Sequence, residues 1–154
     1  MRVILAIDYS ECSARAVEEV AHRRWPEGTT VCVVSGVPKI PPSAAELWFD
    51  ADGSLEAVRE HRRERAHVLT LHAAEILRAA GLTTEAAVVD GTLSKALQIQ
   101  AAHWPAELVI IGSLPCRLLQ SWQAGRIGRR LSRHAACSVE VFHSKRANHS
   151  KIHT

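Results

Sequence analysis

Short runs of apolar residues alternate along the chain with longer segments in which apolar residues recur every three or four positions. The runs at residues 3–7 and 108–111 are wholly apolar. Such runs are typical of strands buried on both faces of a parallel sheet. Further runs rich in β-branched or small apolar residues predict three more strands, over residues 29–37, 83–90 and 138–142.

Helical patterns separate these strands. Ser10 can cap a first helix that Pro26 and Gly28 end, and Thr92 can cap a later helix that Pro105 ends. Residues 55–80 are rich in helix formers and end at Gly81, which predicts the longest helix. Its predicted apolar face consists of Val58, Val68, Leu69, Leu71, Ala73, Ile76, Leu77 and Ala80. A short basic helix is expected over residues 127–135.

Strands and helices therefore alternate five times, which predicts an α/β fold with a parallel sheet and helices on both faces. We expect one domain over residues 2–143, followed by a flexible tail over residues 144–154. The segment 38–54 contains three prolines and is predicted to be a long loop within the domain. Because ligands of such sheets bind at the carboxyl ends of the strands, where strand order reverses, Asp8 and Gly112 are candidate site residues.

Composition and charge narrow the possible functions. The chain has 154 residues, of which 47% are hydrophobic and 23% charged, as in an ordinary globular domain. No apolar run approaches the roughly 20 residues of a membrane helix, and the first one is too short for a secretory signal, so we expect a cytoplasmic protein. A net charge of +3 is compatible with a small anionic ligand but does not favour a nucleic-acid partner.

Cysteine and histidine spacing predicts neither a metal site nor a disulfide. The cysteines form no C-x-x-C pair and are expected to be reduced, mostly buried thiols, at positions 12, 32, 116 and 137. His67 and His72 are five residues apart, which does not place them on one helical face. Ser94 and Ser113 have no general base at a readable spacing, so no catalytic residue is predicted.

Five motifs in order along the chain resemble the universal stress protein family, over about residues 2–143. They are Ala-Ile-Asp-Tyr-Ser at 6–10, Val-Asp-Gly at 89–91, Ala-Glu-Leu-Val-Ile-Ile-Gly-Ser at 106–113, Gly-Arg-Ile-Gly at 125–128, and Ser-Arg-His-Ala-Ala-Cys-Ser-Val-Glu-Val at 132–141. The resemblance implies an open, Rossmann-like sheet in strand order 3-2-1-4-5, of the type found in adenine nucleotide alpha hydrolases. It also implies a homodimer formed through the last strand, residues 138–142, and in one branch of the family the binding of ATP.

The ATP-binding branch wraps the phosphates with a glycine loop of fixed spacing, and this chain keeps the spacing. Gly112, position 115 and Gly125 are separated by two and nine residues, but position 115 is proline and position 126 is arginine instead of serine or threonine. Pro115 removes a backbone donor and fixes φ. The start of the helix at Gly125, together with the Arg126 guanidinium, can still attract an anion.

The resemblance implies a role for each matching residue. Asp8 would approach the ribose or a bridging magnesium ion, and Gly36 would offer backbone groups to the adenine edge. The sugar and phosphates would lie along Ile111, Gly112, Gly125, Arg126 and Ile127. The expected cofactor is ATP or ADP.

Several alternatives stay open beside this interpretation. Asp8 can simply close the first strand by bonding the following turn. A phosphoacceptor receiver domain would use Asp8, Asp90, Ser113 and Lys145, but it needs paired acids after the first strand, where Tyr9 follows Asp8. Two groups of arginines have different neighbours. The arginines at 59, 62, 63 and 65 alternate with glutamates, which predicts a solvated, salt-bridged helix face. The arginines at 126, 129, 130 and 133 have no such acidic neighbours and suit an anionic ligand, an acidic partner or plain solvation.

The leading functional hypothesis is a non-catalytic stress-response protein with an altered adenine-nucleotide or anion crevice. The alternative is a dimeric interaction protein whose nucleotide pocket is vestigial and empty. A slow ATPase is a third possibility, for which the sequence supplies no base. Glu140 interrupts the apolar last strand, so it must face solvent or find a cationic partner.

Overall fold

Five parallel strands form the centre of the protein, and their order agrees with the prediction. The computed structural model describes residues 1–39, 54–112, 137–142 and 151–152. The elements are β1 (Arg2–Ile7), α1 (Glu11–His22), β2 (Thr30–Val37), α3 (Ser54–Ala79), β3 (Thr83–Asp90), α4 (Leu93–His103), β4 (Leu108–Gly112), β5 (Ser138–Val141) and β6 (Lys151–Ile152). The sheet order is β3-β2-β1-β4-β5-β6, with β1 to β5 parallel and β6 antiparallel to β5. The predicted helix over 127–135 and most of the predicted loop over 38–54 lie outside the described residues.

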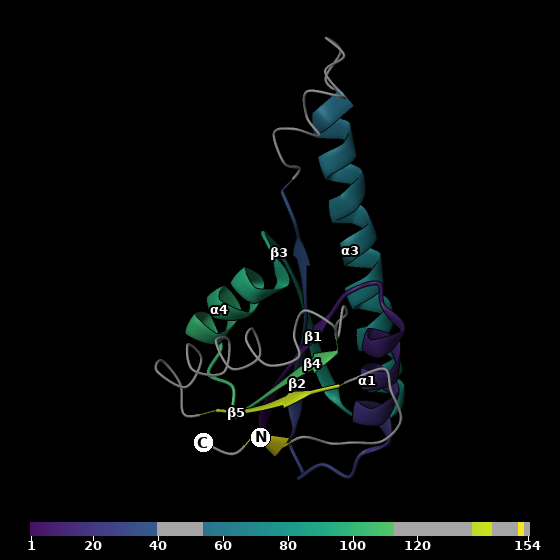
Figure 1. Ribbon diagram of the computed structural model, residues 1–154. Helices are drawn as coiled ribbons and strands as arrows, with labels where there is room; N and C mark the ends of the chain where they lie inside the picture. Colours follow the sequence, from purple (N-terminus) through teal and green to yellow (C-terminus); the bar gives the residue numbers. More distant parts are fainter. Residues whose placement is uncertain (40–53, 113–136, 143–150, 153–154) are drawn as a thin grey trace.

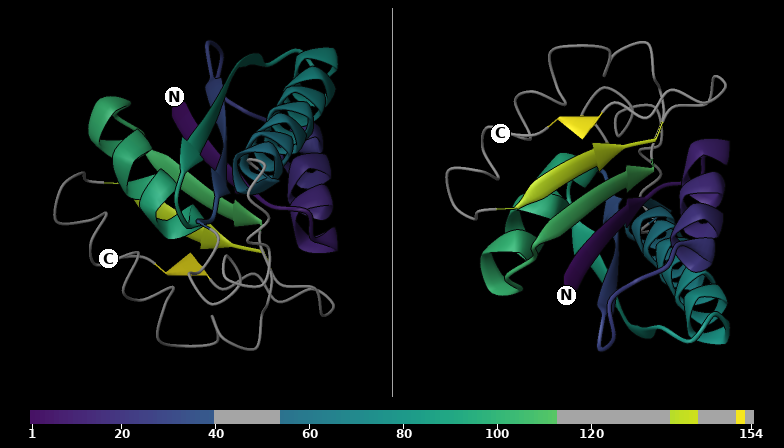
Figure 2. Two further views of the ribbon diagram at one scale, coloured as in Figure 1. Left: turned by 90° about the horizontal axis from the view of Figure 1, so that it is seen from above. Right: turned by 90° about the horizontal axis from the view of Figure 1, so that it is seen from below.

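Helices cover both faces of the sheet, as the alternating pattern predicted. Helices α1 and α3 lie on one face and α4 on the other (Figures 1 and 2). Alternate residues of β1 and β2 supply the two cores, because successive side chains of a strand point to opposite faces. Leu5 and Val33 face α1 and α3, whereas Ile4 and Val34 face α4.

The caps of α1 and α4 are those that the sequence predicted. Ser10 accepts a hydrogen bond from the Ser13 backbone N–H at 3.3 Å, and Thr92 accepts one from the Lys95 N–H at 3.3 Å. These bonds satisfy donors that the first turn of a helix otherwise leaves unpaired. They fix the points at which the chain leaves β1 and β3 and turns into a helix.

The buried face of α3 differs from the predicted one. Val68, Leu71 and Ile76 are 68%, 48% and 37% exposed, although all three were placed on the apolar face. Ala73 and Leu77 are buried as predicted, and the other buried positions are Ala66, Thr70 and Ala74; together they recur at the helical spacing of three or four. Thr70 fits there because its hydroxyl donates to the Ala66 and His67 carbonyls of its own helix.

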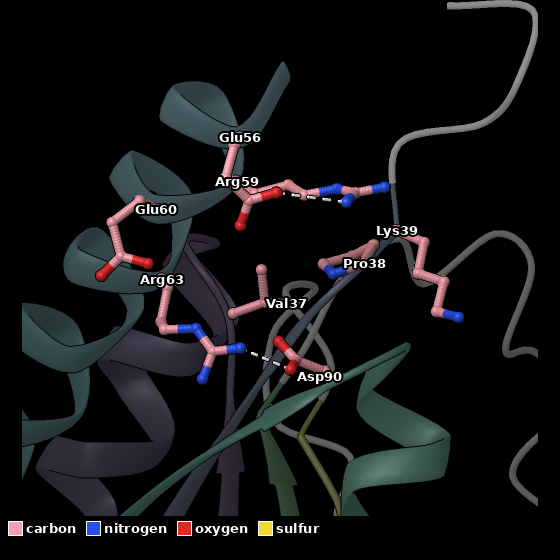
Figure 3. A pocket seen from close by; sticks show the side chains of 8 residues that line it. All are labelled: Val37, Pro38, Lys39, Glu56, Arg59, Glu60, Arg63 and Asp90. Carbon is pink, nitrogen blue, oxygen red and sulfur yellow. Dashed lines mark hydrogen bonds and ion pairs between the residues drawn. The ribbon is translucent and has the colours of Figure 1, made fainter. Parts of the chain in front are cut away.

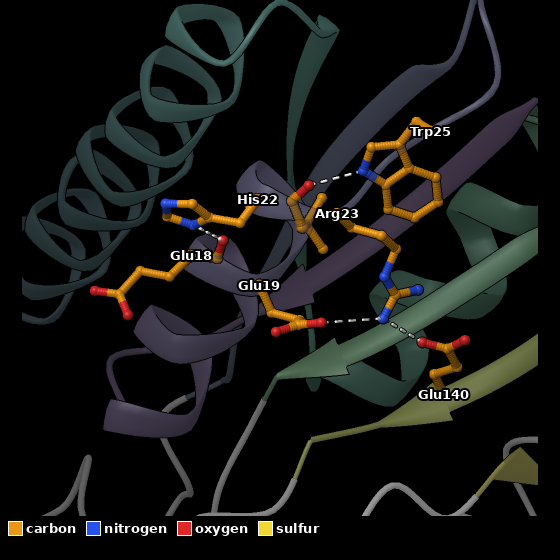
Figure 4. Close-up of polar contacts among 7 residues, drawn as sticks. Glu18, Glu19, His22, Arg23, Trp25 and Glu140 are labelled. Carbon is orange, nitrogen blue, oxygen red and sulfur yellow. Dashed lines mark hydrogen bonds and ion pairs between the residues drawn. The ribbon is translucent and has the colours of Figure 1, made fainter.

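Glu140 has the cationic partner that its place in β5 required. Its carboxylate lies 2.9 Å from the Arg23 guanidinium at the end of α1, and the two side chains are only 19% and 22% exposed (Figure 4). The contact has the length of an ion pair, and among the described residues Glu140 Oε2 has no hydrogen-bond partner. Arg23 also lies 5.1 Å above the Trp25 ring, whose Nε1–H donates to the Val20 carbonyl at 2.7 Å.

The described cysteines, at positions 12, 32 and 137, are buried thiols, as predicted. Burial and, to a lesser extent, the negative charge of Glu85 raise the pKa of Cys32 to about 11, against the opposing effect of the hydrogen bond from Gln100. Cys32 is therefore protonated at neutral pH and behaves as a small apolar side chain. Within the described part of the chain, no helix is long and apolar enough to span a bilayer.

Candidate functional site

The candidate site lies at the carboxyl ends of β1, β2 and β4. The chain leaves β1 toward β2 on one side, while β4 pairs with β1 on the other, so strand order reverses between β1 and β4. The β1–β4 ladder runs to the pair Ile7 and Gly112. Asp8 and Gly112, two of the predicted site residues, are thereby brought together at this point, as the rule for open α/β sheets requires.

Ser13 connects Asp8 to the end of β4. The Asp8 backbone N–H donates to the Ser13 hydroxyl oxygen at 2.7 Å, and Asp8 Oδ1 accepts from the Ser13 hydroxyl at 2.8 Å. The same hydroxyl contacts the Gly112 carbonyl; having a single proton, it donates to one of these acceptors at a time. Asp8 Oδ1 also accepts from the Ser10 N–H at 2.9 Å. Asp8 therefore has the turn-bonding role that was one of its two predicted interpretations, and its ligand role stays a prediction.

Gly112 is glycine because α1 approaches β4 too closely for any side chain. A Cβ added to Gly112 would lie 2.4 Å from the Ala16 Cβ and 3.1 Å from both the Cys12 carbonyl oxygen and the Ser13 Cα. Real Cβ atoms do not approach carbon to 2.4 Å. This close packing holds the first turn of α1 against the end of β4, where a ligand at the switch point would lie.

Gly36 presents its backbone toward the end of β1. The Val37 carbonyl accepts from the Gly91 N–H at 2.8 Å, which shows that the polar groups of Val37 face β3. Because neighbouring residues of a strand alternate, those of Gly36 face β1. The β1–β2 ladder ends at the pair Ala6 and Val34, so among the described residues no strand pairs with Gly36 on that side. The missing Cβ matters as well, since it would lie 2.8 Å from the Gly91 carbonyl oxygen and 2.8 Å from the Leu93 nitrogen.

Tyr9 borders the site on the α3 side. It is 58% exposed, and the Arg65 guanidinium lies 4.8 Å from its ring centre. Partial burial raises the pKa of the Tyr9 phenol, and the positive charge of Arg65 opposes that rise. Tyr9 is thus a neutral, stacked side chain at physiological pH.

A charged pocket of about 270 Å³ lies between α3 and the ends of β2 and β3 (Figure 3). Arg63 forms an ion pair with Asp90 across the pocket, and Arg59 lies 3.4 Å from Glu56 on its own helix. The sequence predicted a solvated, salt-bridged face for both arginines. Both are partly exposed and ion-paired, but Arg63 pairs with Asp90 of β3 and not with a glutamate of α3. The pocket is completed by Val37, Pro38, Lys39 and Glu60.

Only some of the other residues singled out in the sequence lie in the described part of the chain. Asp8 and Asp90 end strands that β2 separates, so they do not share a receiver-type acidic pocket. Within the described ranges no group of three or more potential metal ligands occurs. Ser94 accepts from the Gln98 side chain at 3.4 Å and contacts no described base. The predicted site residues Gly125, Arg126 and Ile127, and the residues Pro115, Ser113 and Lys145, lie outside the described part.

Comparison with known proteins gives a consistent family and fold. The profile of the Universal stress protein family matches residues 1–143. No curated protein sequence matches the chain. A solved structure of the hypothetical protein MJ0577 superposes with a TM-score of 0.70 at 15% identity, covering 95% of this chain and 97% of that one.

Two solved relatives carry adenine nucleotides according to their descriptions. A universal stress protein family protein from Arabidopsis thaliana with AMP bound has a TM-score of 0.61 at 13% identity, covering 92% of this chain and 90% of its own. A universal stress protein in complex with cAMP has a TM-score of 0.54 at 20% identity, covering 94% and 98%. At these identities the likeness shows the fold alone.

Proposed function

Because this chain belongs to the universal stress protein family, we propose that it is a non-catalytic stress-response protein whose crevice at the ends of β1, β2 and β4 binds an adenine nucleotide. The backbone of Gly36, with which no described strand pairs on the β1 side, carries this proposal. Strand β2 continues past the last residue of β1 with which it pairs, and the N–H and C=O of Gly36 lie in this extension. The edge of an adenine ring carries an amino donor and ring-nitrogen acceptors, which can bind this C=O and N–H. That relatives hold AMP and cAMP supports the choice of ligand class.

The other contacts of the proposed complex follow from the predicted site. Asp8 would accept from a ribose hydroxyl or bind a bridging magnesium ion, while Ile111 and Gly112 would lie along the sugar. Gly125, Arg126 and Ile127 would take the phosphates through helix N–H groups and the guanidinium. Because Pro115 lacks one donor of the family's loop, we expect weaker phosphate binding than an intact loop gives.

Calorimetric titration with ADP tests this function. We expect saturable binding with a dissociation constant below about 1 mM, which corresponds to roughly −4 kcal/mol. Asp8→Asn should weaken it about tenfold or more by removing the anionic acceptor. The control is Glu11→Gln, an equal change of charge at an exposed neighbouring position. Absence of heat with ATP, ADP and AMP would contradict the proposal and favour the interaction protein with an empty pocket.

A second comparison separates the altered loop from the rest of the crevice. The double variant Pro115→Gly, Arg126→Ser recreates the spacing and the residue types of the ATP-binding branch. We expect it to bind ATP more tightly than the natural chain does, with adenosine binding unchanged, because only the phosphates contact the loop. Equal gains for ATP and adenosine would show that the loop acts on the whole crevice.

The family resemblance also leads us to propose a homodimer formed through residues 138–142. Sedimentation velocity should show the dimer at tens of micromolar protein, and a chain that remains monomeric there would contradict it. Residues 151–152 already pair with β5 along this edge. A chain that ends at residue 150 should therefore dimerise at lower concentration than one that ends at residue 152.

A further inference from the structure

The charged pocket beside α3 is separate from the nucleotide crevice. Val37 and Asp90 pair in register, and their side chains point to the α3 face of the sheet. A side chain at Gly36 would point to the other face of the sheet, toward the Gly91–Leu93 turn before α4. The polar groups of Gly36 face β1, whereas the pocket is lined by α3 and by the ends of β2 and β3, so the pocket shares no residue with the proposed nucleotide site.

Two arginines from one face of α3 dominate the pocket. Arg59 and Arg63 are one helical turn apart, and both guanidiniums extend from α3 toward the ends of β2 and β3 (Figure 3). Each is oriented by a carboxylate, Arg59 by Glu56 and Arg63 by Asp90. A guanidinium has five donors, so an ion pair of this kind leaves several of them available.

The two ion pairs are open to exchange with a ligand. Arg59 and Glu56 are 51% and 76% exposed, and Arg63 and Asp90 are 42% and 59% exposed. Exposed ion pairs contribute little to stability, so an incoming oxyanion can replace a carboxylate at small cost. Phosphate suits such a pair of guanidiniums, because two N–H groups of a guanidinium match two of its oxygens.

The other residues that line the pocket, together with its volume, indicate the size and chemistry of the ligand. Lys39 adds a third cation, and Glu56, Glu60 and Asp90 are acceptors for hydroxyl groups. Val37 and Pro38 supply an apolar surface on which the C–H face of a sugar can lie. A volume of about 270 Å³ is at the small end of ligand pockets and suits a small ligand better than a nucleoside triphosphate.

We propose that this pocket binds a small sugar phosphate, with the phosphate between Arg59 and Arg63 and the sugar hydroxyls on the carboxylates. This assignment does not depend on the nucleotide crevice, since the two sites share no residue. A protein that holds both ligands would respond to two metabolite classes at once.

Titration of the ¹⁵N-labelled full chain with glucose 6-phosphate tests the proposal. We expect saturable shifts of the Lys39 and Gly91 amides, with weaker binding of inorganic phosphate and none of glucose. Arg63→Gln and Arg59→Gln should each weaken binding about tenfold or more, and Arg63→Lys should weaken it less because the charge remains. The matched control is Arg62→Gln, an exposed arginine of the same helix that does not line the pocket.

Three results would overturn the proposal. They are the absence of shifts up to about 10 mM glucose 6-phosphate, an equal loss in the Arg62→Gln variant, and displacement of the sugar phosphate by adenosine. The second would indicate general attraction to a basic helix, and the third a single shared site. Failure of ADP to bind would leave these outcomes unchanged, so the two sites are tested independently.

Discussion

Replacing Gly112 by alanine should lower the free energy of unfolding by about 3 kcal/mol, the upper end of the usual cost of overpacking. The new methyl group would lie 2.4 Å from the Ala16 Cβ and would also press on the backbone at Cys12 and Ser13. Since α1 can only relieve this contact by moving away from β4, the Ser13 bonds to Asp8 would be strained as well. Urea denaturation followed by circular dichroism measures the change.

Two further variants show whether the contact itself is responsible. Ala16→Gly should cost less in the Gly112→Ala background than in the natural chain, because it removes the atom that the new methyl group meets. Gly81→Ala is the control for backbone strain alone, since Gly81 has φ +90° and open space around the missing Cβ. We expect Gly81→Ala to cost about 1 kcal/mol. Additive losses at positions 16 and 112 would contradict the proposed contact.

Removing Arg23 should produce the second large loss, about 2 kcal/mol for Arg23→Met. Glu140 is 19% exposed and has Arg23 as its ion-pair partner, so the variant leaves a mostly buried carboxylate without its compensating charge. Because methionine keeps much of the packing of Arg23 on Trp25, the loss of stability measures the removal of the Arg23 charge more than the removal of its contact with Trp25. The same denaturation measurement applies.

Neutralising the carboxylate should reverse most of this loss. In the Arg23→Met background, Glu140→Gln should restore stability, because the buried charge is gone. Arg24→Met is the matched control: Arg24 is the neighbouring residue, is exposed and should change stability by less than about 0.5 kcal/mol. If Arg23→Met and Arg24→Met were equally mild, the ion pair would have no measurable role.

The strands and caps were predictable from the sequence because local patterns determine them. The aliphatic runs that became β1 and β4 have almost no polar residue, and only a strand with both faces covered accommodates such a run. Ser10 and Thr92 stand immediately before helical patterns, where a side-chain acceptor is needed. Gly36 and Gly112 were identified through family resemblance, and the contacts that require glycine there became visible only in the structure.

The face of α3 was mispredicted because its apolar residues do not form one stripe. Val68, Leu71 and Ile76 lie outside the sector occupied by Ala66, Ala73 and Leu77, and hydrophobicity alone favoured the larger side chains. Small residues are buried there because α3 packs close to the sheet. No property of the isolated residues indicates how close that approach is.

The pocket beside α3 could not be predicted because its partners are far apart in the chain. Arg63 and Asp90 are 27 residues apart, and glutamates one turn away offered a simpler local partner. The signal in the sequence was the strand-end aspartate before Gly91, an acceptor that a cation of the neighbouring helix can reach. Tertiary placement decides such pairings, and spacing along the chain does not.

The short strand β6 occupies the edge of β5 that the proposed homodimer would use. Residues 151–152 pair antiparallel with Glu140 and Val139, on the edge where a second copy would add its own strand. Residues 143–150 tether this competitor, and a short tether gives an effective concentration on the order of millimolar. A second copy at micromolar concentration must therefore offer a much larger contact than two residues. The length of the chain after β5 would then set the concentration at which dimers form.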